Sequence, residues 1–106
     1  MYKAPVEEIL FTLRHVAGLG DALSAGRFGD LTEDLVEAIL TEAGRFATEE
    51  VAPLGEIGDT QGARLDGHDV KTPDGWAALY RAWAEGGWNS LTGPEAFGGQ
   101  GLPHML

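Results

Sequence analysis

The strongest constraint on the fold is an apolar pattern of helical period between residues 30 and 53. Apolar side chains recur there at steps of three and four and form two parallel stripes. One stripe contains Leu31, Leu35, Ala38, Ile39, Phe46 and Val51, with Glu42 in line with them, and the other contains Val36, Leu40, Ala43 and Ala47. Because two stripes cover more than one side, the helix is predicted to be buried as in a helical bundle. It is expected to begin at the capping-box-like pair Asp30 and Glu33 and to end at Pro53.

One further helix is predicted before this one and another after it. The first spans Pro5 to Leu19, carries one apolar face, and is ended by Gly18 and Gly20. Residues 20–29 are small and turn-prone and are expected to form a connector. The last helix is predicted to open at Thr72-Pro73-Asp74 with an N-cap and a first-turn proline, and to end at Gly86-Gly87.

The last helix carries an aromatic stripe. Trp76, Leu79, Tyr80 and Trp83 fall at positions i, i+3, i+4 and i+7, which places them on one face. Such a stripe could stack on a flavin ring, but apolar residues at this spacing are most often core residues. The stripe is therefore predicted to face the core.

A short hairpin is predicted between the second and third helices. The segment Arg64–Val70 holds an Asp66-Gly67 pair between two extended stretches, which is a tight-turn signal. An isolated two-stranded hairpin is marginal in water, so this one is expected to lean on a neighbour. The predicted fold class is mainly α, an incomplete helical domain of three helices with a small β-hairpin between the second and the third.

Composition excludes several classes of function. The chain has 106 residues, enough for one domain or part of one, and a net charge of −10 that disfavours nucleic acid and other polyanions. It has no cysteine, which excludes disulfides and zinc–thiolate sites. No signal peptide and no membrane span are predicted, so a cytoplasmic protein is expected.

Motifs for catalysis are missing from the sequence. There is no phosphate-binding Gly-x-x-x-x-Gly-Lys loop, and Ser24 lacks the first glycine of a nucleophile elbow. The three histidines, His15, His68 and His104, are far apart and have no spacing for a metal on one helix face. The adjacent carboxylates Glu7-Glu8 and Glu49-Glu50 diverge around a helix. No catalytic, cofactor-binding or metal-binding residue is predicted.

The glycine cluster Gly98-Gly99-Gln100-Gly101 has two possible roles. Its backbone N–H groups could hold a phosphate. Alternatively, its glycines allow positive φ angles and close packing of the chain, and we favour this second role.

The carboxy-terminal segment Trp88–Leu106 carries a family resemblance. It contains Pro94-Glu95-Ala96-Phe97-Gly98-Gly99-Gln100-Gly101-Leu102 and resembles the "GW…L…PE-aromatic-GGxGL" segment of the acyl-CoA dehydrogenase family. Residues 46–54, 58–73 and 75–88 resemble the end of that family's first long helix, a bacterial subgroup's hairpin and its following helix, and residues 1–13 resemble a leading extension of the subgroup. The resemblance implies an extension helix and connector at residues 1–29 and a partial amino-terminal helical domain at residues 30–106.

The resemblance also implies a function for the parent protein. Members of the family use FAD to remove hydrogens from the α and β carbons of an acyl-CoA, pass electrons to an electron-transfer acceptor, and form homo-oligomers. The family's glutamate base and its flavin and coenzyme A contacts match no residue of this chain. This fragment is therefore expected to be catalytically incompetent alone, to bind no FAD, and to be only marginally stable. The alternative is a non-enzymatic helical module that binds a protein partner, with an acidic surface favouring a basic one.

Overall fold

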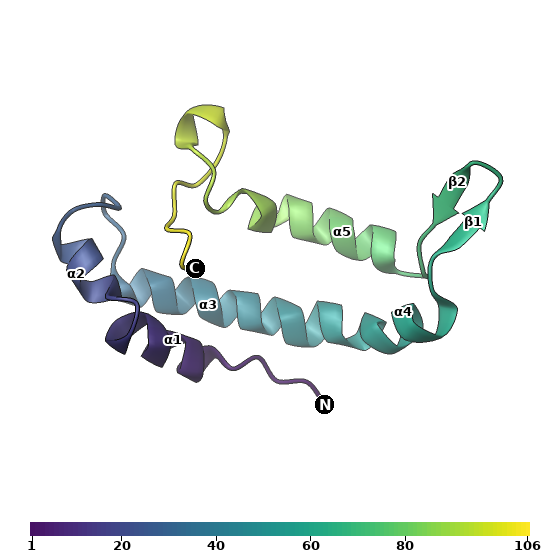
Figure 1. The fold of residues 1–106 in the computed structure, drawn as a ribbon, viewed down its shortest axis with the longest axis horizontal. Helices are drawn as coiled ribbons and strands as arrows, with labels where there is room; N and C mark the ends of the chain where they lie inside the picture. The colour runs from purple at the N-terminus through teal and green to yellow at the C-terminus, as the bar shows by residue number, and fades with distance from the viewer.

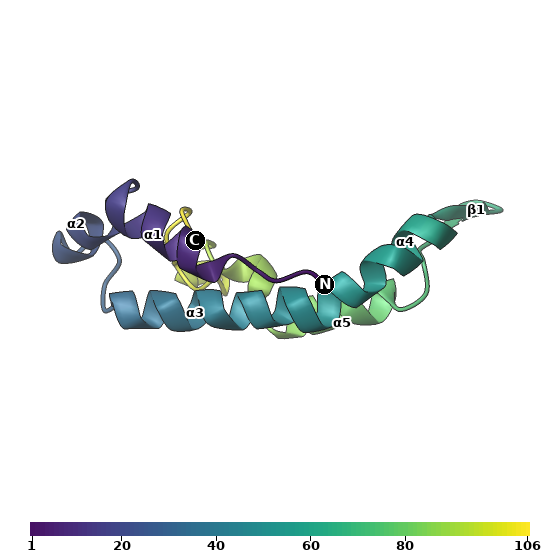
Figure 2. The same cartoon turned by 90° about the horizontal axis from the view of Figure 1, so that it is seen from below.

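A computed structural model describes all residues 1–106 as an elongated, mainly α-helical structure of 53 × 35 × 18 Å (Figures 1 and 2). It contains five α-helical segments, short π and 3-10 turns, and one two-stranded sheet. The α-helices are α1 (Val6–His15), α2 (Leu19–Ser24), α3 (Glu33–Phe46), α4 (Gly55–Gln61) and α5 (Trp76–Glu85), and the strands are β1 (Arg64–Asp66) and β2 (Asp69–Lys71). The predicted fold class, mainly α with a hairpin before the last helix, is confirmed.

The centre of the structure is a long rod that does not end at Pro53. After α3 the chain passes through a π turn (Ala47–Val51) and a 3-10 turn (Ala52–Leu54) and continues as α4. The predicted stop at Pro53 is therefore wrong. Pro53 lies in the first positions of the 3-10 turn, where a backbone N–H is not needed, so the helical path survives.

The rod begins at Thr32 rather than at the predicted pair Asp30 and Glu33. Thr32 has an extended backbone, and its Oγ accepts a hydrogen bond of 3.2 Å from the N–H of Leu35. This is the usual geometry of a helix N-cap. Leu31 is buried just before the cap, so the chain reaches the helix from the core and Asp30 lies outside the cap.

The first predicted helix is shorter than expected, and a second short helix, α2, follows it. α1 ends at His15 instead of Leu19, and the carbonyl of Thr12 accepts from the N–H groups of both Val16 and Ala17. Gly18 then adopts a left-handed conformation (φ 72°), which starts α2 and buries Leu19 completely. Part of the predicted connector is therefore helical.

The hairpin is confirmed, but its turn and its surroundings differ from the prediction. Leu65 pairs with Val70 and Asp66 with Asp69, so the two-residue turn is Gly67-His68 instead of Asp66-Gly67. Gly67 has a positive φ and His68 does not, as in type II′ turns. Every strand residue is exposed, so the hairpin does not pack against another element as predicted (Figure 1).

Helix α5 begins later than predicted and ends where expected. Its N-cap is Gly75 instead of Thr72, and the side chain of Gln61 contacts the turn before it. The Gln61 side chain accepts from the N–H of Asp74 at 3.0 Å and donates to its carboxylate at 3.2 Å. The helix stops at Gly86, and Gly87 has a positive φ.

The apolar core lies at one end of the rod. It is formed by six buried side chains from α1, α2 and α3 and the segment before α3: Leu10, Leu13, Leu19, Leu31, Val36 and Leu40. The carboxy-terminal tail covers it, since Leu102 and Leu106 pack on this cluster and Pro103 is fully buried. Of the two predicted stripes, Val36 and Leu40 face the core, whereas Leu35 and Val51 are exposed.

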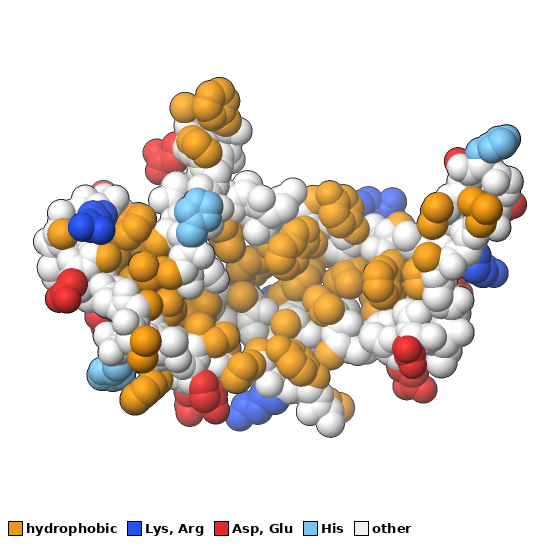
Figure 3. Space-filling view, viewed as in Figure 1, with side chains coloured by type: hydrophobic (Ala, Val, Ile, Leu, Met, Phe, Trp, Pro, Cys, Tyr) orange, Lys and Arg blue, Asp and Glu red, His pale blue; other side chains and the backbone are white.

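Much apolar surface remains uncovered. Only 8 of the 106 residues are buried. The accessible surface is 7582 Å², whereas a compact monomer of this mass would expose about 5,700 Å². The radius of gyration is 17.0 Å, against about 13 Å for a compact domain of this length. Hydrophobic side chains gather in a band between α3 and α5 and over the tail (Figure 3).

Candidate functional site

The glycine cluster at the carboxy terminus forms a closed loop. The backbone N–H groups of residues 98–101 all donate hydrogen bonds of 2.9–3.0 Å to carbonyls of Ser90, Gly93, Pro94 and Glu95. Because these donors are already satisfied within the loop, they are not directed at an external anion. A phosphate cradle needs free N–H groups, and this loop does not offer them.

Close packing explains the glycines of this loop. A Cβ on Gly99 would overlap the carbonyl group of Gly93, so no larger residue fits there. Gly98 and Gly101 have positive φ angles of 85° and 64°, which glycine adopts without strain. The structure therefore supports the packing interpretation of the cluster. The loop directs Leu102 onto the core.

The histidines do not form a site. His15 lies on α1 with its ring centroid 4.7 Å from that of Phe11, His68 lies in the hairpin turn, and His104 is exposed in the tail. No group of three or more histidine, aspartate or glutamate side chains comes close enough to hold a metal ion.

The aromatic stripe of α5 lies on an open face instead of in a core. Trp83 is 36% exposed and meets Phe46 and Trp88 at ring-centroid distances of 6.0 and 6.2 Å, whereas Tyr80 is 66% exposed. Trp76 donates from its indole N–H to the carbonyl of Leu54 at 3.4 Å. The prediction of a core-facing stripe is therefore wrong for this chain. The stripe packs partly on the rod, and the rest of it has no cover.

Space for Trp76 is provided by a glycine of α4. A Cβ on Gly58 would lie 2.5 Å from Cζ2 of the Trp76 ring. The indole therefore lies directly against the helix backbone, and α5 is held to α4 at this point.

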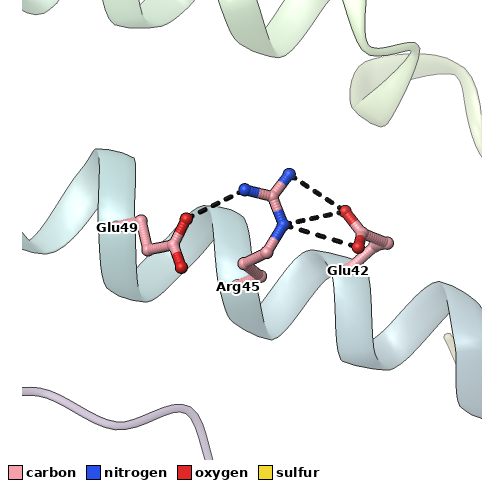
Figure 4. Close-up of polar contacts among 3 residues, drawn as sticks. All are labelled: Glu42, Arg45 and Glu49. Atoms are coloured by element: carbon pink, nitrogen blue, oxygen red, sulfur yellow. Dashed lines mark hydrogen bonds and ion pairs between the residues drawn. The ribbon is translucent and has the colours of Figure 1, made fainter.

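A cleft lies between the amino-terminal arm and α3. It has a volume of about 550 Å³ and is lined mainly by polar and charged residues: Lys3–Glu8, Leu10, Glu37, Thr41, Gly44, Arg45, Thr48 and Glu49. Its arginine is already engaged. The guanidinium of Arg45 contacts Glu42 at 3.1 Å and Glu49 at 2.9 Å (Figure 4). These two carboxylates raise the pKa of Arg45.

A second arginine is paired in the same way. Arg14 of α1 contacts Glu33 at 3.4 Å and Glu37 at 3.0 Å on α3. With both arginines bound to carboxylates, the surface around the cleft is acidic, which is unsuited to the phosphates of coenzyme A or FAD. No helix is both long and apolar enough to cross a membrane.

The fold and these surfaces define a class of polypeptide: an elongated, mainly α-helical segment with a small apolar core and an uncovered apolar face. No protein-family profile matches the chain. Two curated relatives align with 99% of it. A 3-methylmercaptopropionyl-CoA dehydrogenase of Ruegeria pomeroyi is 38% identical over 105 residues, and the broad-specificity linear acyl-CoA dehydrogenase FadE5 of Mycobacterium tuberculosis is 32% identical over 107 residues.

The chain spans 18% of the length of each relative. The alignment with both dehydrogenases extends over nearly every residue of this chain, as expected for a segment of such proteins. The chain therefore belongs to the acyl-CoA dehydrogenase family.

Proposed function

We propose that this chain is a structural segment of a FAD-dependent acyl-CoA dehydrogenase and is not catalytically competent alone. In the parent enzyme, the substrate would be an acyl-CoA thioester, and electrons would pass through FAD to an electron-transfer acceptor. A cytoplasmic location and assembly into homo-oligomers belong to the same proposal. The observation that carries it is the alignment of the whole chain with acyl-CoA dehydrogenases, with only 18% of each relative covered.

The uncovered face supports a scaffold role. Trp76, Tyr80 and Val51 are 43%, 66% and 41% exposed, and extended apolar surfaces of this kind mark places where another part of a protein packs. The division into residues 1–29 and residues 30–106 stays a prediction, although both parts contribute side chains to one apolar core.

Purification of the 106-residue chain tests the proposal. We expect a colourless protein that shows no acyl-CoA-dependent reduction of a dye acceptor, even with FAD added. The control is a full-length relative from the same expression host. Stoichiometric flavin in the purified chain would contradict the proposal, because the loop amides and arginines described above are already engaged.

The same face also suits a non-enzymatic interaction module. Its acidic surroundings would favour a basic protein partner. The two functions differ in one observation: a scaffold segment can replace the matching segment of a dehydrogenase, whereas an independent module cannot.

A further inference from the structure

The hairpin projects from the end of the rod and is in contact with solvent on all sides. Leu65 and Val70 are 77% and 67% exposed although they are its only large apolar side chains. In Figure 1, β1 forms the outer edge of the hairpin and β2 the edge nearer to α5. The backbone edge of β1 is thus open to another strand.

The hairpin is poorly suited to be stable by itself. Arg64 lies opposite Lys71, and Asp66 lies opposite Asp69, so both outer cross-strand pairs join like charges. Like charges directly opposite each other are destabilising, and a lone two-stranded hairpin is marginal in water. A further strand would therefore stabilise it.

The pattern of hydrogen bonds in the hairpin leaves one residue of β1 free to pair outward. In a hairpin with a two-residue turn, the pair beside the turn, Asp66 with Asp69, is the hydrogen-bonded one. Hydrogen-bonded and non-bonded pairs alternate along antiparallel strands, so Leu65 directs its N–H and C=O away from Val70. These two groups point outward from the β1 edge.

The charges of β1 are complementary to those of a second copy. When two β1 strands meet antiparallel with their Leu65 residues opposite each other, each Leu65 exchanges two backbone hydrogen bonds with the other. Arg64 of each copy then faces Asp66 of the other copy. Arg64 and Asp66 therefore face like charges inside the hairpin but opposite charges on the second copy.

The distribution of charge along the chain favours self-association at the hairpin over other parts of the surface. The net charge of −10 opposes association through most of the surface. The hairpin, however, carries two basic and two acidic side chains, Arg64, Lys71, Asp66 and Asp69, and is neutral with its histidine uncharged. It also projects beyond the acidic rod, which keeps the two rods apart.

We infer that β1 is a self-association edge, through which two copies of this chain form a four-stranded antiparallel sheet around a two-fold axis at Leu65. Such an isologous contact is closed and stops at two copies. The paired sheet brings the Leu65 and Val70 side chains of both copies onto one face. It would therefore satisfy the requirement for several strands with an apolar face.

The test measures dimerisation of the full 106-residue chain by sedimentation equilibrium, up to about 1 mM, the weak end of reversible association. Asp66→Arg and Arg64→Asp each make both cross-axis pairs repulsive, and we expect each to weaken dimerisation about tenfold or more. The double variant carrying both substitutions restores opposite charges and should dimerise like the original. A mixture of the two single variants should form a heterodimer although neither pairs with itself.

Two controls keep the result interpretable. Asp69→Arg changes the net charge as much as Asp66→Arg but lies on β2, so it should leave dimerisation unchanged. Inside the hairpin, Asp66→Arg replaces a like-charge pair with an attractive one, so the hairpin of the monomer should be better formed in amide hydrogen exchange. A loss of dimer therefore cannot be attributed to an unfolded hairpin.

Three results would overturn the inference. The chain could remain monomeric at all concentrations, or dimerise with no response to the β1 charges. Alternatively, Asp69→Arg could weaken dimerisation while Asp66→Arg does not, which would assign the contact to β2. None of these results bears on the catalytic part of the acyl-CoA dehydrogenase proposal, which is tested through flavin content.

Discussion

Leu40→Ala should destabilise the chain much more than Leu35→Ala, although both positions lie inside α3. Leu40 is 7% exposed and belongs to the six-residue core, whereas Leu35 is 48% exposed. The two substitutions change helix propensity equally, so their difference reports burial alone.

The size of the effect follows from the packing of each side chain. Replacing a buried leucine by alanine costs about 2–5 kcal/mol, including the cavity term. The core here has only six buried side chains, so a value near the lower end, about 2–3 kcal/mol, is expected for Leu40→Ala. Leu35→Ala removes about half as much apolar contact and should lower the free energy of unfolding by about 1 kcal/mol. A chain of this length shifts its melting midpoint by about 4–8 °C per kcal/mol.

The assay is thermal unfolding followed by far-ultraviolet circular dichroism. We expect the midpoint to fall by about 10–20 °C for Leu40→Ala and by about 5 °C for Leu35→Ala. Starting stability should be near the low end for domains, about 5 kcal/mol, so both variants still fold in the cold. Equal shifts for the two variants would refute the location of the core.

Two further predictions concern the loop and the exposed ion pairs. Gly99→Ala should detach the tail from the core, because the added Cβ would overlap the carbonyl group of Gly93. The measurement is limited proteolysis, in which cleavage after residue 98 should become faster. Gly55→Ala is the control, since this position has open space and a helical φ of −60°, and it should leave the tail protected. Faster cleavage in both variants would argue against the packing role of the loop. The second prediction is that Arg45→Gln shifts the melting midpoint equally at about pH 6 and about pH 9. Glu42 and Glu49 raise the pKa of Arg45 in the folded chain. The stability that Arg45 contributes is therefore fully present below the pKa of an arginine in the unfolded chain. It is lost only as pH rises through the pKa of the folded state, which lies far above this range. A shift that differs between the two pH values would show that another titrating group depends on Arg45.

The sequence identifies the elements of this fold better than it identifies their ends. Periodicity finds the helical rod, and Gly86-Gly87 ends α5 as predicted. Pro53 fails as a stop because a 3-10 turn tolerates proline, and the Thr32 cap is hidden by the more conspicuous Asp30 and Glu33. These outcomes depend on local backbone geometry, which residue type alone does not determine.

Predictions of burial fail where tertiary context decides. The aromatic stripe of α5 has the spacing of a core face, yet Tyr80 is 66% exposed because no further element covers it in this chain. The glycine loop shows the opposite case: its sequence left phosphate binding and close packing open, and the favoured packing role is supported because its N–H groups are used internally. Donors that are already satisfied cannot be recognised from a sequence.

A chimeric enzyme decides whether this chain supplies structure, rather than a site, to an acyl-CoA dehydrogenase. The aligned 105-residue segment of the Ruegeria pomeroyi relative is replaced with this chain, and flavin content is measured together with the relative rates on two acyl-CoA substrates. We predict a folded enzyme with full flavin and the host's substrate preference. A folded chimera with less flavin or an altered preference would contradict the scaffold role, because this segment would then take part in the site.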